Sequence, residues 1–123
     1  MAKGPENQFK DQITKHLTSA GHYYYVNMAG VAQKGLPDIL ACINKRFVAF
    51  ELKRPDNKKS FLTRQQKAHL QAITDNGGLA FVVADWDYYL EIYSKLMLDP
   101  DTIESNTHQD LLKTDEQVLN VCW

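Results

Sequence analysis

The sequence predicts an α/β fold, in which a small mixed β-sheet is flanked by helices. Two observations lead to this class. Short runs of β-branched and aromatic residues alternate with segments that carry the 3.6-residue apolar period of a helix. The 123 residues, of which 44% are hydrophobic, are enough for one hydrophobic core. We therefore expect a single domain over residues 1–123, with its core at about 6–84 and an acidic helical extension at about 86–123.

The N-terminal part of the chain predicts a helix followed by a strand. Residues 6–20 carry apolar side chains four residues apart, as one face of a helix does, and Gly21 suits the helix end. Residues 23–28 are rich in β-formers and predict a strand. Residues 29–36 contain two glycines and predict a loop.

Two apolar runs in the middle of the chain predict an antiparallel hairpin. The first strand covers residues 39–43, the turn is Asn44-Lys45, and the second strand runs through residues 47–53. A connection of two residues joins strands that lie side by side. We expect Cys42 to be buried in the first of these strands.

A polar loop over residues 54–60 separates the hairpin from a helix over residues 63–76. Thr63 suits the N-cap position of this helix, and Gln66, three residues later, completes a capping box. Three further elements are predicted: a buried strand over residues 79–84, a helix over residues 86–97, and a last helix over residues 108–119.

Charge is distributed unevenly along the chain. Residues 1–67 hold 12 of the 14 basic residues and carry a net charge of +7, whereas residues 68–123 carry −8. A basic half suggests a polyanionic partner, although a solvated basic face would look the same.

Several classes of protein are not supported by the sequence. No apolar run is long enough to span a bilayer, and the N-terminus lacks the apolar core of a signal peptide. The two cysteines form no disulfide framework, so we expect a cytoplasmic protein without membrane contact. No glycine-rich phosphate loop indicates a nucleotide cofactor, and the four histidines have no metal-ligand spacing.

The predicted hairpin places three charged residues together. Asp38 precedes its first strand, and Glu51 and Lys53 lie on one face of its second strand, which is otherwise apolar. A charge in a buried strand requires a partner or a metal ion, and two facing carboxylates favour a cation between them. Oxygen ligands of this kind select Mg²⁺ or Mn²⁺, and such an ion can activate water for phosphodiester hydrolysis. The alternative is a structural Glu51–Lys53 ion pair at a strand end.

This arrangement resembles the PD-(D/E)xK nuclease superfamily, and within it the VRR-NUC family. The resemblance covers residues 6–84, about two-thirds of the chain. Three segments carry it: Gly35-Leu36-Pro37-Asp38-Ile39-Leu40, Phe50-Glu51-Leu52-Lys53-Arg54-Pro55, and Leu62-Thr63-Arg64-Gln65-Gln66-Lys67-Ala68-His69-Leu70. The Gly77-Gly78 break and the apolar strand Phe81-Val82-Val83 complete the pattern.

The resemblance implies a metal-dependent DNA endonuclease with a restriction-endonuclease-like fold. It implies Asp38, Glu51 and the backbone carbonyl of Leu52 as ligands of Mg²⁺ or Mn²⁺, and Lys53 as the catalytic lysine. The family also carries a glutamine on the helix that follows the lysine strand, which Gln66 fits.

Two assignments that the resemblance implies have alternatives. Gln65 is the second choice for the glutamine on the helix. The family has a glutamate on its first helix, where Glu6 is the candidate; Glu6 can equally be an acidic residue that complements the helix dipole. Stand-alone, phage-type members resemble Holliday-junction resolvases and work as homodimers, so branched DNA and a second copy of this chain are the implied partners.

Basic residues surround the proposed site in sequence and are candidates for contacts with DNA phosphates: Lys34, Arg54, Lys58, Lys59, Arg64 and Lys67. Their alternative role is loop solubility. The aromatic run Trp86, Tyr88, Tyr89 and Tyr93 is interpreted as core filling, with a dimer contact as the alternative.

Two other functions remain open on sequence grounds. The chain can be a catalytically inactive DNA-binding or recombination accessory module on a nuclease fold. A sequence-specific restriction enzyme is less favoured, because so short a chain leaves little room for target recognition.

Overall fold

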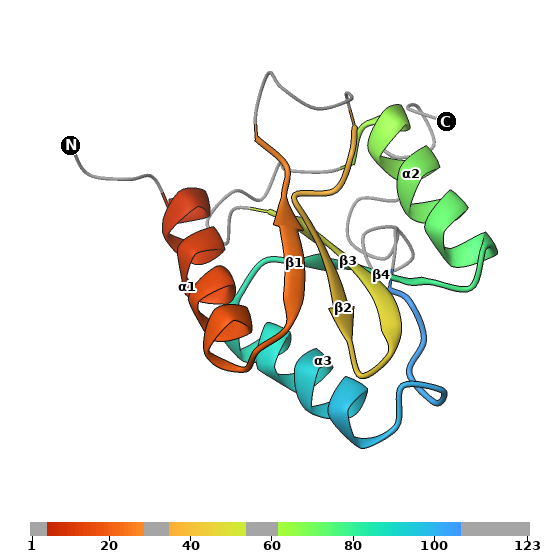
Figure 1. Cartoon of the computed structure of the whole chain (residues 1–123). Helices are drawn as coiled ribbons and strands as arrows, with labels where there is room; N and C mark the ends of the chain where they lie inside the picture. Colours follow the sequence, from red (N-terminus) through yellow and green to blue (C-terminus); the bar gives the residue numbers. More distant parts are fainter. Residues whose placement is uncertain (1–4, 29–34, 54–61, 107–123) are drawn as a thin grey trace.

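A four-stranded mixed sheet with helices on both faces makes up the computed structural model, which describes residues 5–28, 35–53 and 62–106 (Figure 1). This confirms the predicted fold class. The elements in chain order are α1 (Pro5–Ser19), β1 (Tyr23–Val26), β2 (Ile39–Ile43), β3 (Arg46–Leu52), α2 (Arg64–Asp75), β4 (Leu79–Val83) and α3 (Trp86–Leu98).

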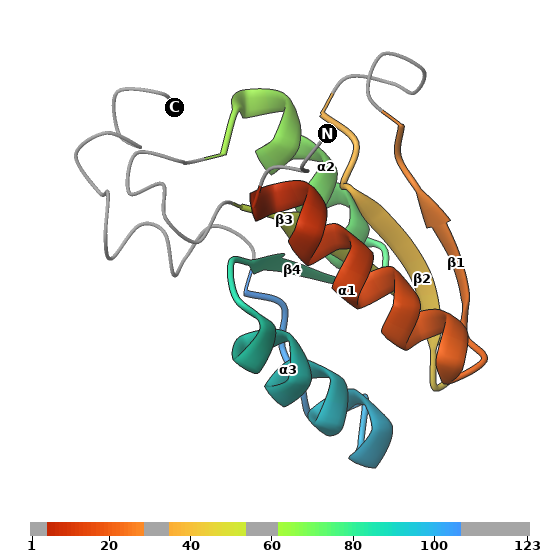
Figure 2. The same cartoon turned by 90° about the vertical axis from the view of Figure 1, so that its left-hand side faces the viewer.

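The strands lie in the order β1-β2-β3-β4. β1 pairs antiparallel with β2, and β2 pairs antiparallel with β3, to which it is joined by a turn of two residues. β3 and β4 are parallel, and α2 provides the crossover that a parallel pair requires. α1 therefore lies on one face of the sheet and α2 on the other (Figure 2).

The β2–β3 hairpin turns at the two predicted residues. Asn44 and Lys45 both have positive φ, at 48° and 68°. A two-residue turn with positive φ at both positions matches the right-handed twist of the strands that it joins. The amide Nδ2 of Asn44 donates to the Leu96 carbonyl at 3.0 Å, which ties this turn to α3.

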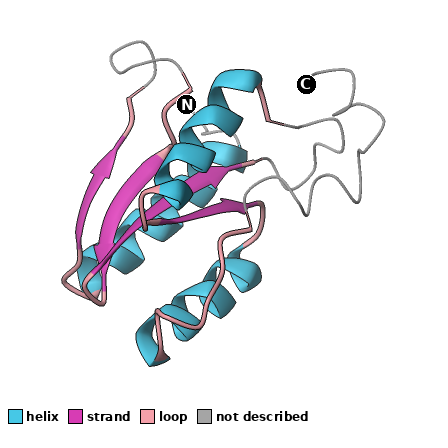
Figure 3. Ribbon diagram, turned by 90° about the vertical axis from the view of Figure 1, so that its right-hand side faces the viewer, coloured by secondary structure: helices cyan, strands magenta, loops and turns pink. Residues whose placement is uncertain are grey.

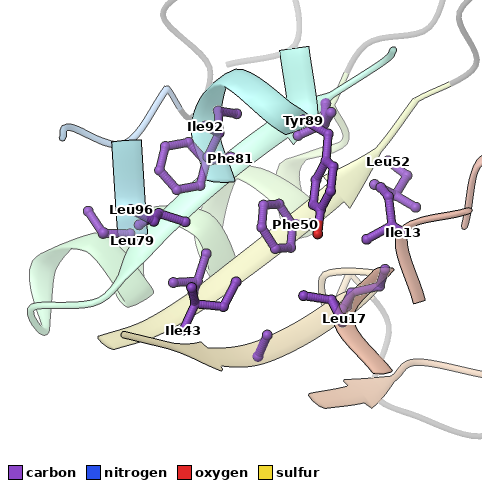
Figure 4. Packing of buried hydrophobic residues seen from close by; sticks show 14 of the residues in the cluster. Ile13, Leu17, Ile43, Phe50, Leu52, Leu79, Phe81, Tyr89, Ile92 and Leu96 are labelled. Carbon is purple, nitrogen blue, oxygen red and sulfur yellow. The ribbon is translucent and has the colours of Figure 1, made fainter. Parts of the chain in front are cut away.

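The larger part of the hydrophobic core lies between the sheet, α1 and α3 (Figure 4). Phe9, Ile13 and Leu17 of α1 are buried here, as the helical stripe predicts. The Phe50 ring lies 5.5 Å from that of Tyr89 on α3, measured between centroids. Aromatic residues of α3 thus fill the core, which confirms the favoured interpretation of that run.

Two histidines of the α1 region contact tyrosines of α3. His16 Nδ1 lies 2.8 Å from the Tyr89 hydroxyl, and His22 Nε2 lies 2.7 Å from the Tyr93 hydroxyl. Burial lowers the pKa of His16, and the charge of His22 adds to the effect. Burial raises the pKa of Tyr89, so its hydroxyl stays protonated.

The opposite face of the sheet packs against α2, which lies in front of the strands in Figure 3. Small strand residues, Ala49 and Ala80, meet Leu70 of the helix. Alternation along β3 directs Phe50 and Leu52 to the larger core and Ala49 and Glu51 to the α2 side. Glu51 therefore lies in the layer between the sheet and α2.

Residues after α3 cover the outer edge of β4. The Ser105 hydroxyl accepts from the Ala80 N–H at 2.9 Å. The Asn106 side-chain amide accepts from the Val82 N–H at 2.6 Å and donates to the Val82 carbonyl at 3.0 Å. These side chains replace a further strand and protect an edge that would otherwise expose unpaired backbone groups.

Some predictions differ from the structure. β1 ends at Val26 and not at Met28. Cys42 is exposed because it points away from the larger core, which its neighbours Ala41 and Ile43 face. The predicted helix over residues 108–119 lies outside the described residues. In the described part of the chain, no helix is both long and apolar enough to cross a membrane.

Candidate active site

The hairpin places Asp38 and Glu51 opposite each other. Ile39 pairs with Phe50 at the end of the β2–β3 ladder, and the next pair in the same register is Asp38 with Glu51. Residues directly opposite in an antiparallel pair present their side chains on the same face. The carboxylate oxygen Oδ2 of Asp38 accepts a hydrogen bond from the Leu52 N–H at 2.8 Å, which fixes the side chain against β3.

Pro37 deprives the Leu52 carbonyl of the donor that an antiparallel ladder would supply at this position. The same register places Pro37 opposite Leu52, at a position where two residues would normally exchange N–H and C=O bonds. Proline has no N–H to donate to the Leu52 carbonyl. Because the N–H of Leu52 points toward Asp38, its carbonyl points to the same side of β3.

Glu51 is the buried member of the site, with 3% of the residue exposed. Its oxygen Oε2 accepts a hydrogen bond from the Gln66 amide Nε2 at 3.1 Å and lies 4.0 Å from the Lys53 ammonium. That ammonium also donates to Gln66 Oε1 at 3.3 Å. A buried carboxylate, a lysine and an amide thus form one connected group, with the Lys53 side chain 14% exposed.

The helix cap fixes the orientation of the Gln66 amide. The Thr63 N–H donates to Gln66 Oε1 at 2.9 Å, and the Gln66 N–H donates to the Thr63 hydroxyl at 3.1 Å, which is the predicted capping box. Since Oε1 accepts from both Thr63 and Lys53, the amide nitrogen faces Glu51. Gln65, the alternative choice, is exposed on the helix surface.

Gly35 holds the segment before Asp38 against the start of α2. Its φ is +84°, and a Cβ at this position would lie 2.4 Å from Gln65 Cβ. Any side chain here would therefore separate the Asp38 segment from the helix that carries Gln66. A glycine at this position permits the close approach of α2.

The oxygen atoms at this site fit Mg²⁺ or Mn²⁺. Asp38 Oδ1 makes no hydrogen bond within the described residues, and Glu51 and the Leu52 carbonyl provide further oxygen donors beside it. No three His, Cys, Asp or Glu side chains gather in the described ranges. The described residues would offer a cation two carboxylates and a carbonyl, and Mg²⁺ often takes its remaining ligands from water and phosphate.

The other predicted site residues lie in different places. Glu6 is in the first turn of α1, but its side chain is outside the described part of the chain, as are Lys34, Arg54, Lys58 and Lys59. Arg64 is exposed in the first turn of α2.

Lys67 requires a correction. With 1% of its surface exposed, it is buried beneath α2 and does not present its ammonium to a phosphate outside the protein. We therefore remove Lys67 from the set of phosphate contacts.

One residue beside the site was not found from the sequence. Asn27 donates from its amide Nδ2 to the Leu36 carbonyl at 3.1 Å, and its backbone N–H donates to the Asp38 carbonyl at 2.8 Å. A single asparagine after a strand is common, so the sequence alone carried no indication of this contact.

Comparison with known proteins gives one result of interest. No family model matches the sequence, and no curated protein does. Among solved structures, the chain is similar to Hjc of Archaeoglobus fulgidus, a Holliday junction resolvase from an archaeal hyperthermophile. The two are 25% identical with a TM-score of 0.48, and the match covers 64% of this chain and 67% of Hjc.

Proposed function

We propose that this chain is a Mg²⁺- or Mn²⁺-dependent DNA endonuclease of the PD-(D/E)xK type, with VRR-NUC as its family. The observation that carries this proposal is the juxtaposition of Asp38 and Glu51 across the hairpin, with Lys53 and Gln66 bonded around Glu51. An ion pair alone would not require Asp38, a proline opposite Leu52 and a partly buried glutamine at the same strand ends.

Each residue has a role in phosphodiester hydrolysis. Asp38, Glu51 and the Leu52 carbonyl would hold the cation. When bound, the cation lowers the pKa of its water and offsets negative charge on the reacting phosphate. Lys53, partly exposed beside Glu51, orients the attacking water or contacts that charge. Gln66 keeps Glu51 and Lys53 in place.

Residues around this group provide the DNA-binding surface of the proposal. Arg64 lies exposed in the first turn of α2. Lys34, Arg54, Lys58 and Lys59 are the further phosphate contacts that we propose, and Glu6 is an additional acidic group of the site. Contacts of this kind give affinity without sequence preference.

We propose branched DNA, and in particular the four-way junction, as the substrate, following the sequence resemblance to stand-alone VRR-NUC proteins. A four-way junction has two strands to cut symmetrically, which suits a twofold dimer. Exposed apolar side chains on the α2 side of β1 and β3, Tyr23, Tyr25 and Phe47, support a second copy as the partner of this face. Phe47→Asp should then convert a dimer to a monomer in light scattering.

We place the protein in the cytoplasm of a bacterial cell, in agreement with the unpaired Cys42, and a phage origin suits its family type.

A cleavage assay tests the activity. End-labelled four-way junction, flap, matched duplex and single strand are incubated with Mg²⁺, Mn²⁺ or EDTA. We expect paired symmetric nicks on the junction, lost with EDTA and reduced about 10²- to 10⁴-fold in Lys53→Ala. Lys95→Ala, which removes an exposed lysine on α3, is the control and should cut like the wild type.

The other outcomes point to different functions. Cleavage of flaps or duplex would retain the nuclease and exclude the resolvase. Tight junction binding without cleavage in either metal would identify an inactive DNA-binding module. Cleavage that persists in Lys53→Ala would refute the assignment of this site.

A further inference from the structure

Asn27 makes two hydrogen bonds to the segment that carries Asp38, one from its backbone and one from its side chain. Its backbone N–H bonds to the Asp38 carbonyl, which continues the β1–β2 register one pair beyond Val26 and Ile39. Its side chain bonds to the Leu36 carbonyl. One residue therefore fixes the main chain on both sides of Pro37, and the direction of the Asp38 side chain depends on that main chain.

The side chain of Asn27 lies on the same face of the sheet as the candidate site. Tyr25 is paired with Leu40, which packs on the α2 side, and alternation puts residue 27 on that side as well. Asn27, Asp38 and Glu51 thus form one row across three neighbouring strand ends. Asp38 lies in the middle of this row.

Among the described residues, none donates a hydrogen bond to the amide oxygen of Asn27. Its Oδ1 is buried and makes no hydrogen bond within the described residues. Buried polar atoms nearly always have a partner, and an atom left without one in a protein points to water, an ion or a ligand at that place. The Nδ2 of the same amide is held by Leu36, so the orientation that leaves Oδ1 without a donor is fixed.

We propose that Asn27 is a positioning residue of the cation site. It sets the direction of Asp38 through the main chain of residues 36–38, and its Oδ1 is the acceptor for a water bound to the cation. This inference rests on the proposed function, because it takes Asp38 as a cation ligand. Mg²⁺ keeps several of its waters in proteins, and removing the groups that hold a metal's outer ligands weakens metal binding about 10- to 100-fold.

The test measures cation binding without DNA. The thermal unfolding midpoint is followed in a titration with Mg²⁺ and with Mn²⁺ for the wild type, Asn27→Ala and Asn44→Ala. Asn44 is the matched control, since its Nδ2 also donates to a backbone carbonyl, at 3.0 Å, but at the opposite end of the hairpin. We expect Asn27→Ala to need about tenfold more cation for half of the stabilisation. Asn44→Ala should lower the metal-free midpoint and leave the cation requirement unchanged.

Cleavage kinetics and a second variant complete the test. At saturating cation, the turnover of Asn27→Ala should stay within about threefold of the wild type, because the loss lies in cation affinity. Asn27→Asp keeps an acceptor oxygen but loses the Nδ2 donor to the Leu36 carbonyl, so it should restore part of the affinity that Asn27→Ala loses. The inference is overturned if Asn27→Ala loses stability but binds the cation like the wild type. The role of Oδ1 as the acceptor for a bound water is overturned if Asn27→Asp recovers none of the affinity.

Failure of the proposed function has a different appearance. In that case Mg²⁺ and Mn²⁺ do not raise the unfolding midpoint of the wild type, and they do not raise that of Asp38→Ala either. A wild type that responds to cation, with a response lost in Asp38→Ala but unchanged in Asn27→Ala, would remove the role of Asn27 alone.

Discussion

Replacing Gln66 with alanine, beside Thr63→Ala, distinguishes the contribution of Gln66 to the helix cap from its contribution to the candidate site. The Gln66 side chain takes part in both. The change removes the bond that Gln66 Oε1 accepts from the Thr63 N–H, and it removes the amide that donates to Glu51. Thr63→Ala removes the other bond of the capping box and leaves the Gln66–Glu51 contact intact. Gln65→Ala shortens the exposed neighbour and touches neither.

The expected losses follow from these contacts. Loss of a helix N-cap costs about 1 kcal/mol of unfolding free energy, which is the expectation for Thr63→Ala. Gln66→Ala loses a comparable cap term and leaves a buried carboxylate without its amide donor, at a cost of about 1–3 kcal/mol. We therefore expect about 2–4 kcal/mol for Gln66→Ala and less than about 0.5 kcal/mol for Gln65→Ala. Urea unfolding at equilibrium measures all three.

Cleavage rates under single-turnover conditions then separate structure from catalysis. If Gln66 holds Glu51 and Lys53 for the reaction, its loss should slow cleavage at least tenfold, equivalent to about 1.4 kcal/mol of activation free energy. Thr63→Ala should cut at nearly the wild-type rate under conditions where it is folded. A Gln66→Ala protein that is destabilised only as much as Thr63→Ala and cuts normally would show that Gln66 is a helix cap and nothing more.

Two further predictions concern stability. Gly35→Ala should lower the unfolding free energy by about 2–4 kcal/mol, because the cost of positive φ and the close contact with Gln65 add together. Gly21→Ala, with similar φ and nothing within 4 Å, should lower it by about 1–2 kcal/mol. Equal losses for the two variants in urea unfolding would contradict the close approach at Gly35. The lowered pKa of His16 means that the unfolded chain takes up its proton first as the pH falls below 6.5, so the unfolding free energy decreases in that range and is retained above it. His16→Asn should reduce this decrease between pH 7.5 and 5, and an unchanged pH profile would rule out His16 as its source.

Local signals in the sequence were sufficient for most of the fold. The turn at Asn44-Lys45 and the capping box of Thr63 and Gln66 depend on residues within a few positions of each other, and the structure contains both. The pairing of Asp38 with Glu51 followed from the hairpin, because a two-residue turn fixes the register of its strands.

Contacts between distant elements could not be predicted in the same way. Lys67 was assigned to the surface from its residue type, yet it lies three residues before Leu70 on the buried stripe of α2. Cys42 was assigned to the interior from its strand, but alternation along β2 directs it away from the larger core, and it is exposed. Asn27 acquires its importance from Leu36 and Asp38, which β1 reaches only after the sheet has formed.

Pro37 links the sequence motif to the chemistry of the site. A residue with an N–H at this position would bond to the Leu52 carbonyl and continue the ladder between β2 and β3. With proline, that carbonyl receives no hydrogen bond from residue 37, and the Leu52 N–H donates to the Asp38 carboxylate. The backbone ladder between β2 and β3 therefore ends at the two carboxylates. Oδ2 of Asp38 accepts the last hydrogen bond, from the Leu52 N–H. Oδ1 of Asp38, the Leu52 carbonyl and the Glu51 carboxylate lie next to this bond. A proline before the aspartate thus ends an ordinary hairpin at the group of oxygen atoms that we propose as cation ligands, without adding a loop.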